Sequence, residues 1–188
     1  MLKKTIRETY LEQRLKLADD ALLDYNARII DKFNSFSLPQ TDYLLSYYPL
    51  AAKNEFDVSQ CEVIMKQQFP LVTIGWPRLA DGLVMEAFQI QTDGLYAKNR
   101  YNILEPINGE WIPPELINVV FVPLVAFDKK GYRVGYGKGF YDRFLLRCKQ
   151  NVLKIGFSFF EPLDEIRDID EFDVPLNFCI TPSRIYEF

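Results

Sequence analysis

Val119-Val-Phe-Val-Pro-Leu-Val-Ala-Phe127 is an apolar run that leads toward a glycine-rich segment, Gly131-Tyr-Arg-Val-Gly-Tyr-Gly-Lys-Gly-Phe-Tyr-Asp-Arg143. The apolar run is typical of a buried central strand, and Tyr141-Asp-Arg-Phe-Leu-Leu-Arg147, which ends the segment, favours a helix. We call residues 131–143 the glycine loop. A strand that enters a glycine-rich turn and then a helix can cradle phosphate, because glycines let backbone N–H groups approach oxygen atoms and a helix N-terminus adds partial positive charge.

Strands and helices alternate along the rest of the chain. The sequence predicts helices at 2–18, 20–36 and 59–68, and Ser59 with Glu62 predicts a capping box for the last of them. It predicts strands at 43–48, 71–74, 84–91, 116–122, 152–158 and 178–181, with a loop-rich region at 92–115. The alternation predicts an α/β fold, a Rossmann-like arrangement of three layers in which helices flank a mostly parallel sheet. In such sheets the ligand binds at the carboxyl ends of the strands, which is where we expect the glycine loop.

Length and composition narrow the class of protein. A chain of 188 residues predicts one domain that spans 1–188. The net charge of −4 argues against nonspecific binding to nucleic acid. No apolar run is long enough to cross a bilayer, and the charged N-terminus lacks the apolar core of a signal peptide. The three cysteines are widely spaced and imply neither a disulfide framework nor a zinc site. We therefore expect a cytoplasmic protein that binds neither membranes nor nucleic acid.

The chain contains no histidine. This absence excludes hydrolases that use a Ser-His-Asp or Cys-His mechanism, and it excludes histidine metal sites. Any chemistry must come from carboxylates, lysine, arginine, hydroxyls, backbone amides or a metal bound through oxygen. Such groups suit phosphoryl transfer, in which positioning and charge neutralisation supply most of the catalysis.

The glycine loop matches neither of the two common phosphate-binding patterns. Gly137-Lys138 is followed by Gly139 rather than Ser or Thr, so the loop is not a P-loop. Gly135-x-Gly137-x-Gly139 also lacks the spacing of the dinucleotide-binding pattern. A flexible hairpin with glycines at positive φ is the plainer alternative. Three cations interleaved with the glycines favour an anion site instead, and these are Arg133, Lys138 and Arg143.

Several charged residues outside the glycines admit two interpretations each. Asp142 fits either the start of a helix or a Mg²⁺ ligand. Lys3, Arg7, Tyr10 and Arg14 share one helical face, which is either solvated or folded over the glycine loop to hold phosphate. Glu55 and Asp57 follow the first strand, and an acidic stretch runs from 161 to 173. Surface charge is the plainer interpretation of both, and the sequence leaves these alternatives open.

The glycine loop, together with the preceding Val122-Pro-Leu-Val-Ala-Phe-Asp128, closely resembles the signature of 5-formyltetrahydrofolate cyclo-ligases, also called methenyltetrahydrofolate synthetases. Further matches run nearly from end to end of the chain. They are Lys3-x-x-x-Arg7, Glu55-Phe-Asp57, Pro77-Arg78, Ile103-Leu-Glu-Pro106 and Asp173-Val-Pro-Leu-Asn177. The resemblance implies conversion of 5-formyltetrahydrofolate to 5,10-methenyltetrahydrofolate, with ATP and Mg²⁺ required and ADP and phosphate released.

The resemblance also implies roles for particular residues. The implied ATP contacts are Lys3, Lys4, Arg7, Arg133, Val134, Gly135, Tyr136, Gly137, Lys138, Gly139, Phe140 and Tyr141. The implied contacts to the reduced folate are Glu55, Tyr136, Gly137, Lys138, Gly139 and Phe140. Lys138 and Arg133 are the implied catalytic residues, because their positive charges stabilise the phosphoryl group in transit. Asp142 and Asp173 are the implied Mg²⁺ ligands.

Four positions depart from the family pattern. Phe140 replaces a common tyrosine, Val134 replaces leucine, Asn177 replaces aspartate, and Tyr101 stands where tryptophan is frequent. Two other functions stay open beside the cyclo-ligase: a phosphotransferase that acts on another small substrate, and a nucleotide or folate sensor without catalysis. We expect the protein to be a monomer.

Overall fold

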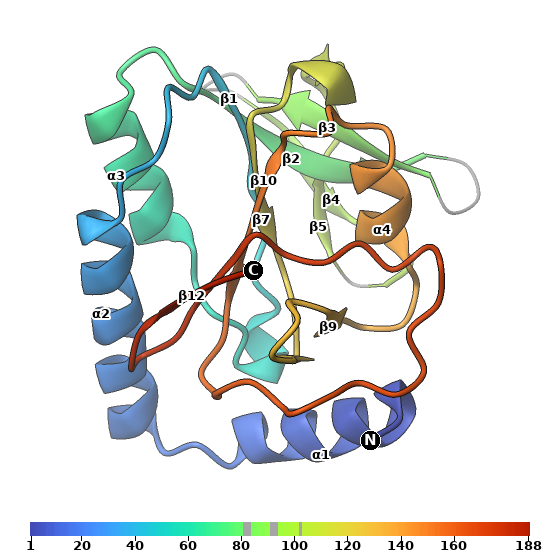
Figure 1. Cartoon of the computed structure of the whole chain (residues 1–188). Helices are drawn as coiled ribbons and strands as arrows, with labels where there is room; N and C mark the ends of the chain where they lie inside the picture. Colours follow the sequence, from blue (N-terminus) through green and yellow to red (C-terminus); the bar gives the residue numbers. More distant parts are fainter. Residues whose placement is uncertain (81–83, 91–93, 102) are drawn as a thin grey trace.

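The structure is a computed structural model that describes residues 1–80, 84–90, 94–101 and 103–188. Its central feature is an eight-stranded sheet with the strand order β12-β11-β10-β7-β1-β2-β3-β6 (Figure 1). The strands of this sheet are β1 (Tyr43–Leu45), β2 (Thr73–Leu79), β3 (Met85–Gln89), β6 (Glu110–Ile112), β7 (Val119–Val122), β10 (Leu153–Phe157), β11 (Phe178–Ile180) and β12 (Ile185–Glu187).

The middle of the sheet is parallel and its edges are antiparallel. The apolar run forms β7, which pairs in parallel with β1 on one side and with β10 on the other. The parallel pairing continues from β1 to β2 and from β10 to β11, whereas β12, β3 and β6 are added antiparallel. The predicted mostly parallel α/β sheet is therefore confirmed. The antiparallel edges were not predicted, because β6 and β12 have three residues each, too few to show a periodicity.

Helices cover both faces of the sheet. Because side chains alternate along a strand, Val119 and Phe121 of β7 point to one face while Val120 and Val122 point to the other. The first face packs against α2 (Asp19–Ser35) and α3 (Ser59–Gln68), and the second packs against α4 (Phe140–Leu145). Figure 1 shows α2 and α3 on one side of the sheet and α4 on the other. Val119–Val122 are fully buried as a result.

Helix α1 (Lys3–Leu15) lies beneath the glycine loop rather than along the main sheet (Figure 1). Its Ile6 is buried against Ala126 and Val134, which belong to the two-stranded sheet β8 (Ala126–Phe127) and β9 (Arg133–Val134), and against Ile166. This contact fixes one face of α1 next to the start of the glycine loop. None of the helices in the described part of the chain is both long and apolar enough to cross a membrane.

Three local predictions need correction. The strand predicted at 116–122 starts only at Val119, because Pro114–Leu116 form a 3-10 helix, and it ends at Val122 as predicted, before Pro123. The region predicted to be loop-rich contains β4 (Tyr96–Lys98), β5 (Leu104–Pro106) and β6 in its described part. The predicted capping box at Ser59 is wrong, because Glu62 accepts a hydrogen bond from Ser46 Oγ at 2.5 Å, and the Ser59 N–H donates to Asp57 instead. The predicted strand at 84–91 appears as β3, and its last residue, Gln91, lies outside the described residues.

Candidate functional site

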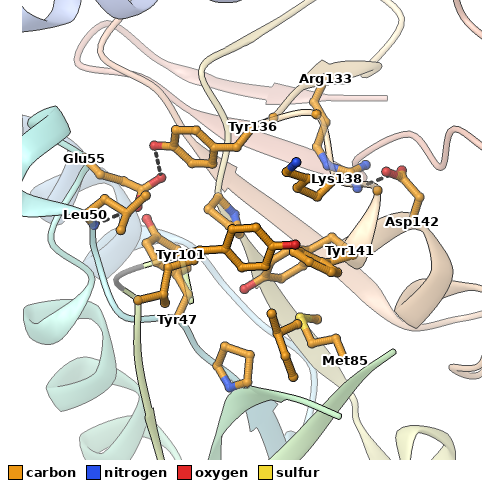
Figure 2. Close-up of a pocket in the computed structure, with 18 of the residues that line it drawn as sticks. Tyr47, Leu50, Glu55, Met85, Tyr101, Arg133, Tyr136, Lys138, Tyr141 and Asp142 are labelled. Carbon is orange, nitrogen blue, oxygen red and sulfur yellow. Dashed lines mark hydrogen bonds and ion pairs between the residues drawn. The ribbon is translucent and has the colours of Figure 1, made fainter. Parts of the chain in front are cut away.

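A cavity of about 510 Å³ opens at the carboxyl ends of β1 and β7. Tyr47 and Tyr48 follow β1 and line it, and Pro123, which directly follows β7, lines it as well. Figure 2 shows side chains from the glycine loop, from the segment after β1 and from the sheet converging on this space. The position agrees with the expectation that a parallel sheet binds its ligand where its central strands end.

Most of the predicted site residues line this one cavity. They are Lys3, Arg7, Glu55, Arg133, Val134, Gly135, Tyr136, Gly137, Lys138, Gly139, Phe140, Tyr141, Asp142 and Asp173. Lys4 is exposed and does not line the described wall of the cavity. Asn177 is also outside this wall, because it bridges the sheet by accepting a hydrogen bond from the Lys154 N–H at 3.0 Å.

The glycine loop has a backbone that side chains would strain. Gly137 and Gly139 have φ angles of +83° and +63°, in the left-handed region. A Cβ on Gly137 would lie 3.1 Å from Arg7 Cζ, so α1 and the glycine loop approach each other too closely for a larger residue without movement. The Arg7 Nε–H donates to the Gly135 carbonyl at 2.7 Å. Helix α1 therefore holds the glycine loop in place by a direct contact.

The three cations of the glycine loop have different surroundings. Lys138 is exposed, and its Nζ lies 5.5 Å from the centre of the Tyr101 ring across the cavity (Figure 2). The Arg133 side chain is only 5% exposed, and its Nη2 donates to Asp142 Oδ1 at 2.9 Å. Arg143 donates to the Lys138 carbonyl at 2.6 Å, so it supports the loop from outside the cavity. Lys138 is thus the cation of the loop that is best placed to reach a ligand.

Asp142 and Asp173 are linked through the backbone amide that joins Asp173 to Val174. Asp142 Oδ1 accepts a hydrogen bond from the Val174 N–H at 3.2 Å, and Val174 is the next residue after Asp173. Asp173 Oδ2 accepts from the Lys3 ammonium and from the Asp170 N–H. Within the described residues, Asp142 Oδ2 and Asp173 Oδ1 make no hydrogen bond. The two carboxylates therefore keep one oxygen each for a hard cation such as Mg²⁺.

The described residues contain no cluster of three carboxylate, cysteine or histidine side chains that would enclose a metal ion. Mg²⁺ characteristically keeps several waters and takes one or two carboxylates together with substrate phosphates. A pair of carboxylates beside the glycine loop fits that coordination habit, and it fits poorly with a closed structural metal site. The outer acidic residues form surface ion pairs, as the plainer interpretation predicts: Asp164 pairs with Lys129 and Glu165 pairs with Lys130.

Glu55 lies at the opposite end of the cavity, where Tyr136 of the glycine loop contacts it. The Tyr136 hydroxyl donates to Glu55 Oε1 at 2.6 Å, and the Leu50 N–H donates to Glu55 Oε2 at 2.9 Å (Figure 2). Burial raises the pKa of Glu55, while these two hydrogen bonds and the charges of Arg14 and Lys53 act to lower it. Glu55 is a partly buried acceptor held by two hydrogen bonds, and not the surface charge of the plainer interpretation.

The part of the cavity between Glu55 and Lys138 is largely apolar and aromatic. Tyr101 packs edge-on against Phe140 with ring centres 5.8 Å apart, and it covers the cavity from the β4–β5 side. The apolar wall is completed by Leu50, Leu79, Met85 and Ile103. Such a lining, with a carboxylate at one end and cations at the other, suits a flat heterocycle with N–H donors that joins a site for anions.

Sequence reasoning underestimated one residue, Arg14. It was assigned only to the basic face of the first helix, yet it is 4% exposed and contacts the Tyr136 hydroxyl. The same buried face explains why Lys3 and Arg7 line the cavity while Tyr10 packs against Phe160. The helical spacing of these residues was the available signal, and it did not distinguish a solvated face from one covered by the glycine loop.

The chain resembles proteins of one family in both sequence and fold. A family model described as the 5-formyltetrahydrofolate cyclo-ligase family matches residues 2–182. The 5-formyltetrahydrofolate cyclo-ligase of Escherichia coli (strain K12) is 37% identical over 93 residues, which is 48% of this chain and 51% of that protein. The alignment thus spans about half the length of this curated relative.

Two solved structures share the fold over nearly the whole chain. A 5,10-methenyltetrahydrofolate synthetase from Mycoplasma pneumoniae superposes with a TM-score of 0.77 at 25% identity, covering 97% of this chain and 99% of that one. The 5,10-methenyltetrahydrofolate synthetase of Aquifex aeolicus gives a TM-score of 0.77 at 28% identity, covering 100% of this chain and 93% of the other.

Proposed function

Because the chain belongs to the 5-formyltetrahydrofolate cyclo-ligase family, we propose that it converts 5-formyltetrahydrofolate to 5,10-methenyltetrahydrofolate with consumption of ATP. The observation that carries this proposal is the shared cavity, in which the glycine loop, the Asp142–Asp173 pair and Glu55 all line one space. A nucleotide and a reduced folate can therefore meet there without a second chain. The proposal covers the activity, the two substrates and the requirement for Mg²⁺.

The reaction joins a phosphoryl transfer to a ring closure. The formyl oxygen of the folate attacks the γ-phosphorus of ATP, a new O–P bond forms, and the bond to the β-phosphate oxygen breaks to release ADP. The neighbouring folate amine then attacks the formyl carbon, the C–O bond to phosphate breaks, and the amine loses its proton. The first step moves negative charge onto oxygen atoms, so it needs cations and N–H donors placed in advance.

The residues of the cavity supply these groups. Lys138 is exposed toward the cavity and stabilises charge on the phosphoryl group in transit. Arg133 is nearly buried and paired with Asp142, so it contributes mainly its charge and the orientation of that carboxylate. Lys3 and Arg7 line the same wall from α1, and the backbone of residues 134–141 offers N–H donors to the phosphates.

Asp142 and Asp173 are the residues that would hold Mg²⁺ beside the phosphates, through the carboxylate oxygens left without hydrogen bonds among described residues. When bound, such an ion neutralises charge on the phosphates of ATP. Lys3 and Arg133 hold the two carboxylates in place by pairing with the other oxygens. The arrangement suits a metal that arrives together with the nucleotide.

Glu55 is placed to select the folate. A carboxylate accepts hydrogen bonds only, and the pterin ring of a reduced folate offers amino and ring N–H donors. Each oxygen of Glu55 accepts one hydrogen bond from the protein and retains lone pairs for a ligand. The apolar wall that contains Leu79, Met85 and Tyr101 covers the faces of a ring held in this way.

The test is direct. Purified protein incubated with ATP, Mg²⁺ and 5-formyltetrahydrofolate should produce the near-ultraviolet absorbance of the methenyl product, with ADP released in equal amount. ADP release that depends on a different small acid or amide, with the folate inactive, would favour a phosphotransferase instead. Binding of ATP or folate without any turnover would favour a sensor. Either result would refute the proposed reaction.

We also propose that the protein acts in the cytoplasm as a monomer whose residues 1–188 form one domain. The glycine loop, the Asp142–Asp173 pair and Glu55 all come from one chain, so the proposed site needs no residue from a partner. The net charge of −4 and the small local set of cations support small-molecule substrates over nucleic acid. Gel filtration with light scattering measures the state directly, and a stable dimer would contradict this part of the proposal.

A further inference from the structure

Arg14 joins three segments of the chain that surround the cavity. Its Nε–H donates to the Lys53 carbonyl at 2.8 Å and Nη1 donates to the Leu124 carbonyl at 3.1 Å. Its Nη2 donates to the Tyr136 hydroxyl at 2.6 Å. Arg14 is 4% exposed, so none of these contacts is an incidental surface pair. Each of its three guanidinium nitrogens donates a hydrogen bond to the protein, which is not expected of an arginine on a solvated helix face.

The contacts of Arg14 fix the direction of the next hydrogen bond. An arginine can only donate, so the Tyr136 oxygen accepts from Arg14 and has a single proton left to donate. That proton is directed to Glu55 Oε1, 2.6 Å away. Lys53 Nζ lies 4.2 Å from the centre of the Tyr136 ring and braces the same tyrosine from its face. The rotation of the hydroxyl is thus determined by Arg14.

We propose that Arg14 is a positioning residue for the folate half of the reaction: acting through Tyr136, it orients the Glu55 carboxylate toward the substrate. This inference rests on the proposed function, because it takes Glu55 as the acceptor for the pterin. It assigns the Tyr136 side chain to folate recognition, while the backbone at the same position belongs to the nucleotide loop. Arg14 lies behind the cavity wall, since it is not among the residues that line the cavity, so it acts through Tyr136.

The hydrogen bonds from Arg14 to Tyr136 and from Tyr136 to Glu55, which we call the relay, affect the pH at which Glu55 becomes protonated. Burial raises the pKa of Glu55, and the Tyr136 hydrogen bond, the Leu50 N–H, Arg14 and Lys53 oppose that rise. The other titratable groups that face Glu55 are Tyr47 and Tyr141, phenols whose own pKa values are raised by burial and that stay neutral. Removal of the Tyr136 hydroxyl takes away a contact that favours the ionised acid. The pKa of Glu55 then rises. On acidification, Glu55 therefore becomes protonated, and stops accepting hydrogen bonds from folate, at a higher pH than in the wild-type protein.

The experiment compares Tyr136→Phe and Arg14→Lys with wild type in steady-state kinetics over a series of pH values. For Tyr136→Phe we expect the KM for 5-formyltetrahydrofolate to rise roughly tenfold, the effect of one hydrogen bond to a charged group. The KM for ATP should change little, and the acidic limb of kcat/KM for folate should move to higher pH. Arg14→Lys should act in the same direction, because one ammonium cannot serve the carbonyls of Lys53 and Leu124 and the tyrosine hydroxyl together.

Two control variants separate positioning from general loss of structure. Tyr132→Phe removes a phenol from the same loop outside the cavity wall, and Arg28→Lys alters an exposed arginine on α2 whose Nε–H donates to the Pro182 carbonyl at 3.1 Å. Both should keep wild-type kinetics. A folded Tyr136→Phe protein with the wild-type folate KM and acidic limb would overturn this inference and leave the proposed reaction intact. Equal losses for folate and ATP at every pH would also overturn it. Absence of product from the wild-type enzyme would instead remove the proposed function, and this inference with it.

Discussion

Replacement of Lys138 by alanine separates catalysis from stability in this protein. Lys138 is exposed, and its Nζ contacts the Tyr101 ring at 5.5 Å from the ring centre. An exposed cation–aromatic contact contributes about 0.5–1 kcal/mol, so the free energy of unfolding should fall by no more than that. In contrast, a unit charge about 4 Å from a developing charge contributes about 4 kcal/mol at an effective dielectric constant of about 20.

The expected loss of rate follows from that second figure. About 4 kcal/mol corresponds to roughly a thousandfold fall in kcat, and removal of a donor from an oxyanion site typically costs about 10²–10³-fold. Lys138→Ala is assayed by formation of the methenyl product at saturating ATP and folate. Its stability is measured in parallel by urea unfolding. Lys138→Arg, which keeps the charge, should recover part of the rate.

Lys130→Ala is the matched control. Lys130 is an exposed lysine of the hairpin that leads into the glycine loop, and its ammonium pairs with Glu165 at 2.9 Å, away from the cavity wall. Its removal should leave both the rate and the stability near wild type. A folded Lys138→Ala enzyme with wild-type turnover would refute the assigned role of Lys138. Similar losses in the two alanine variants would refute it too, because the effect would then belong to the overall charge.

Three further predictions concern the metal pair, the loop backbone and the core. Asp142→Asn keeps an acceptor for Arg133, so it should fold normally but need more Mg²⁺ for half-maximal turnover; an unchanged Mg²⁺ titration would exclude Asp142 as a ligand. Gly137→Ala places a Cβ at φ +83° and 3.1 Å from Arg7 Cζ, which strains the loop by about 1–2 kcal/mol. This strain should raise the KM for ATP about tenfold. An unaffected KM would argue against nucleotide binding by the loop. Phe121→Ala empties a fully buried site in the sheet and should lower the free energy of unfolding by about 3–5 kcal/mol in urea titration, whereas a loss below about 1 kcal/mol would show that the core refills the space.

The parallel core of the fold was predictable because its signals are local. The run that forms β7 is apolar on both faces, as a strand covered by helices on each side must be, and its pattern is readable within a few residues. The glycines that follow mark the place where the backbone takes left-handed φ angles. The absence of histidine limits the chemistry whatever the fold, because it removes a residue type from the whole chain. The strand and loop signals depend only on the sterics and solvation of neighbouring residues.

The incorrect local predictions share a cause as well. The capping box at Ser59 failed because Glu62 contacts Ser46, a residue brought near by the pairing of β1 rather than by the helix itself. Edge strands such as β12 have three residues and owe their conformation to the partner strand they meet. In each case a tertiary contact outweighed a weak local preference.

The sequence by itself determined the parallel sheet, the glycine loop and the chemical types available for catalysis. Only the tertiary structure decided that Arg14, Glu55 and Tyr136 form one relay, across separations of 122 residues from Arg14 to Tyr136 and 81 from Glu55 to Tyr136. Periodicity on a helix places Arg14 on a face but does not say what covers that face. That face is covered by the segments that follow β1 and β7. Their positions depend on the order of the strands in the whole sheet, which the helix sequence does not contain.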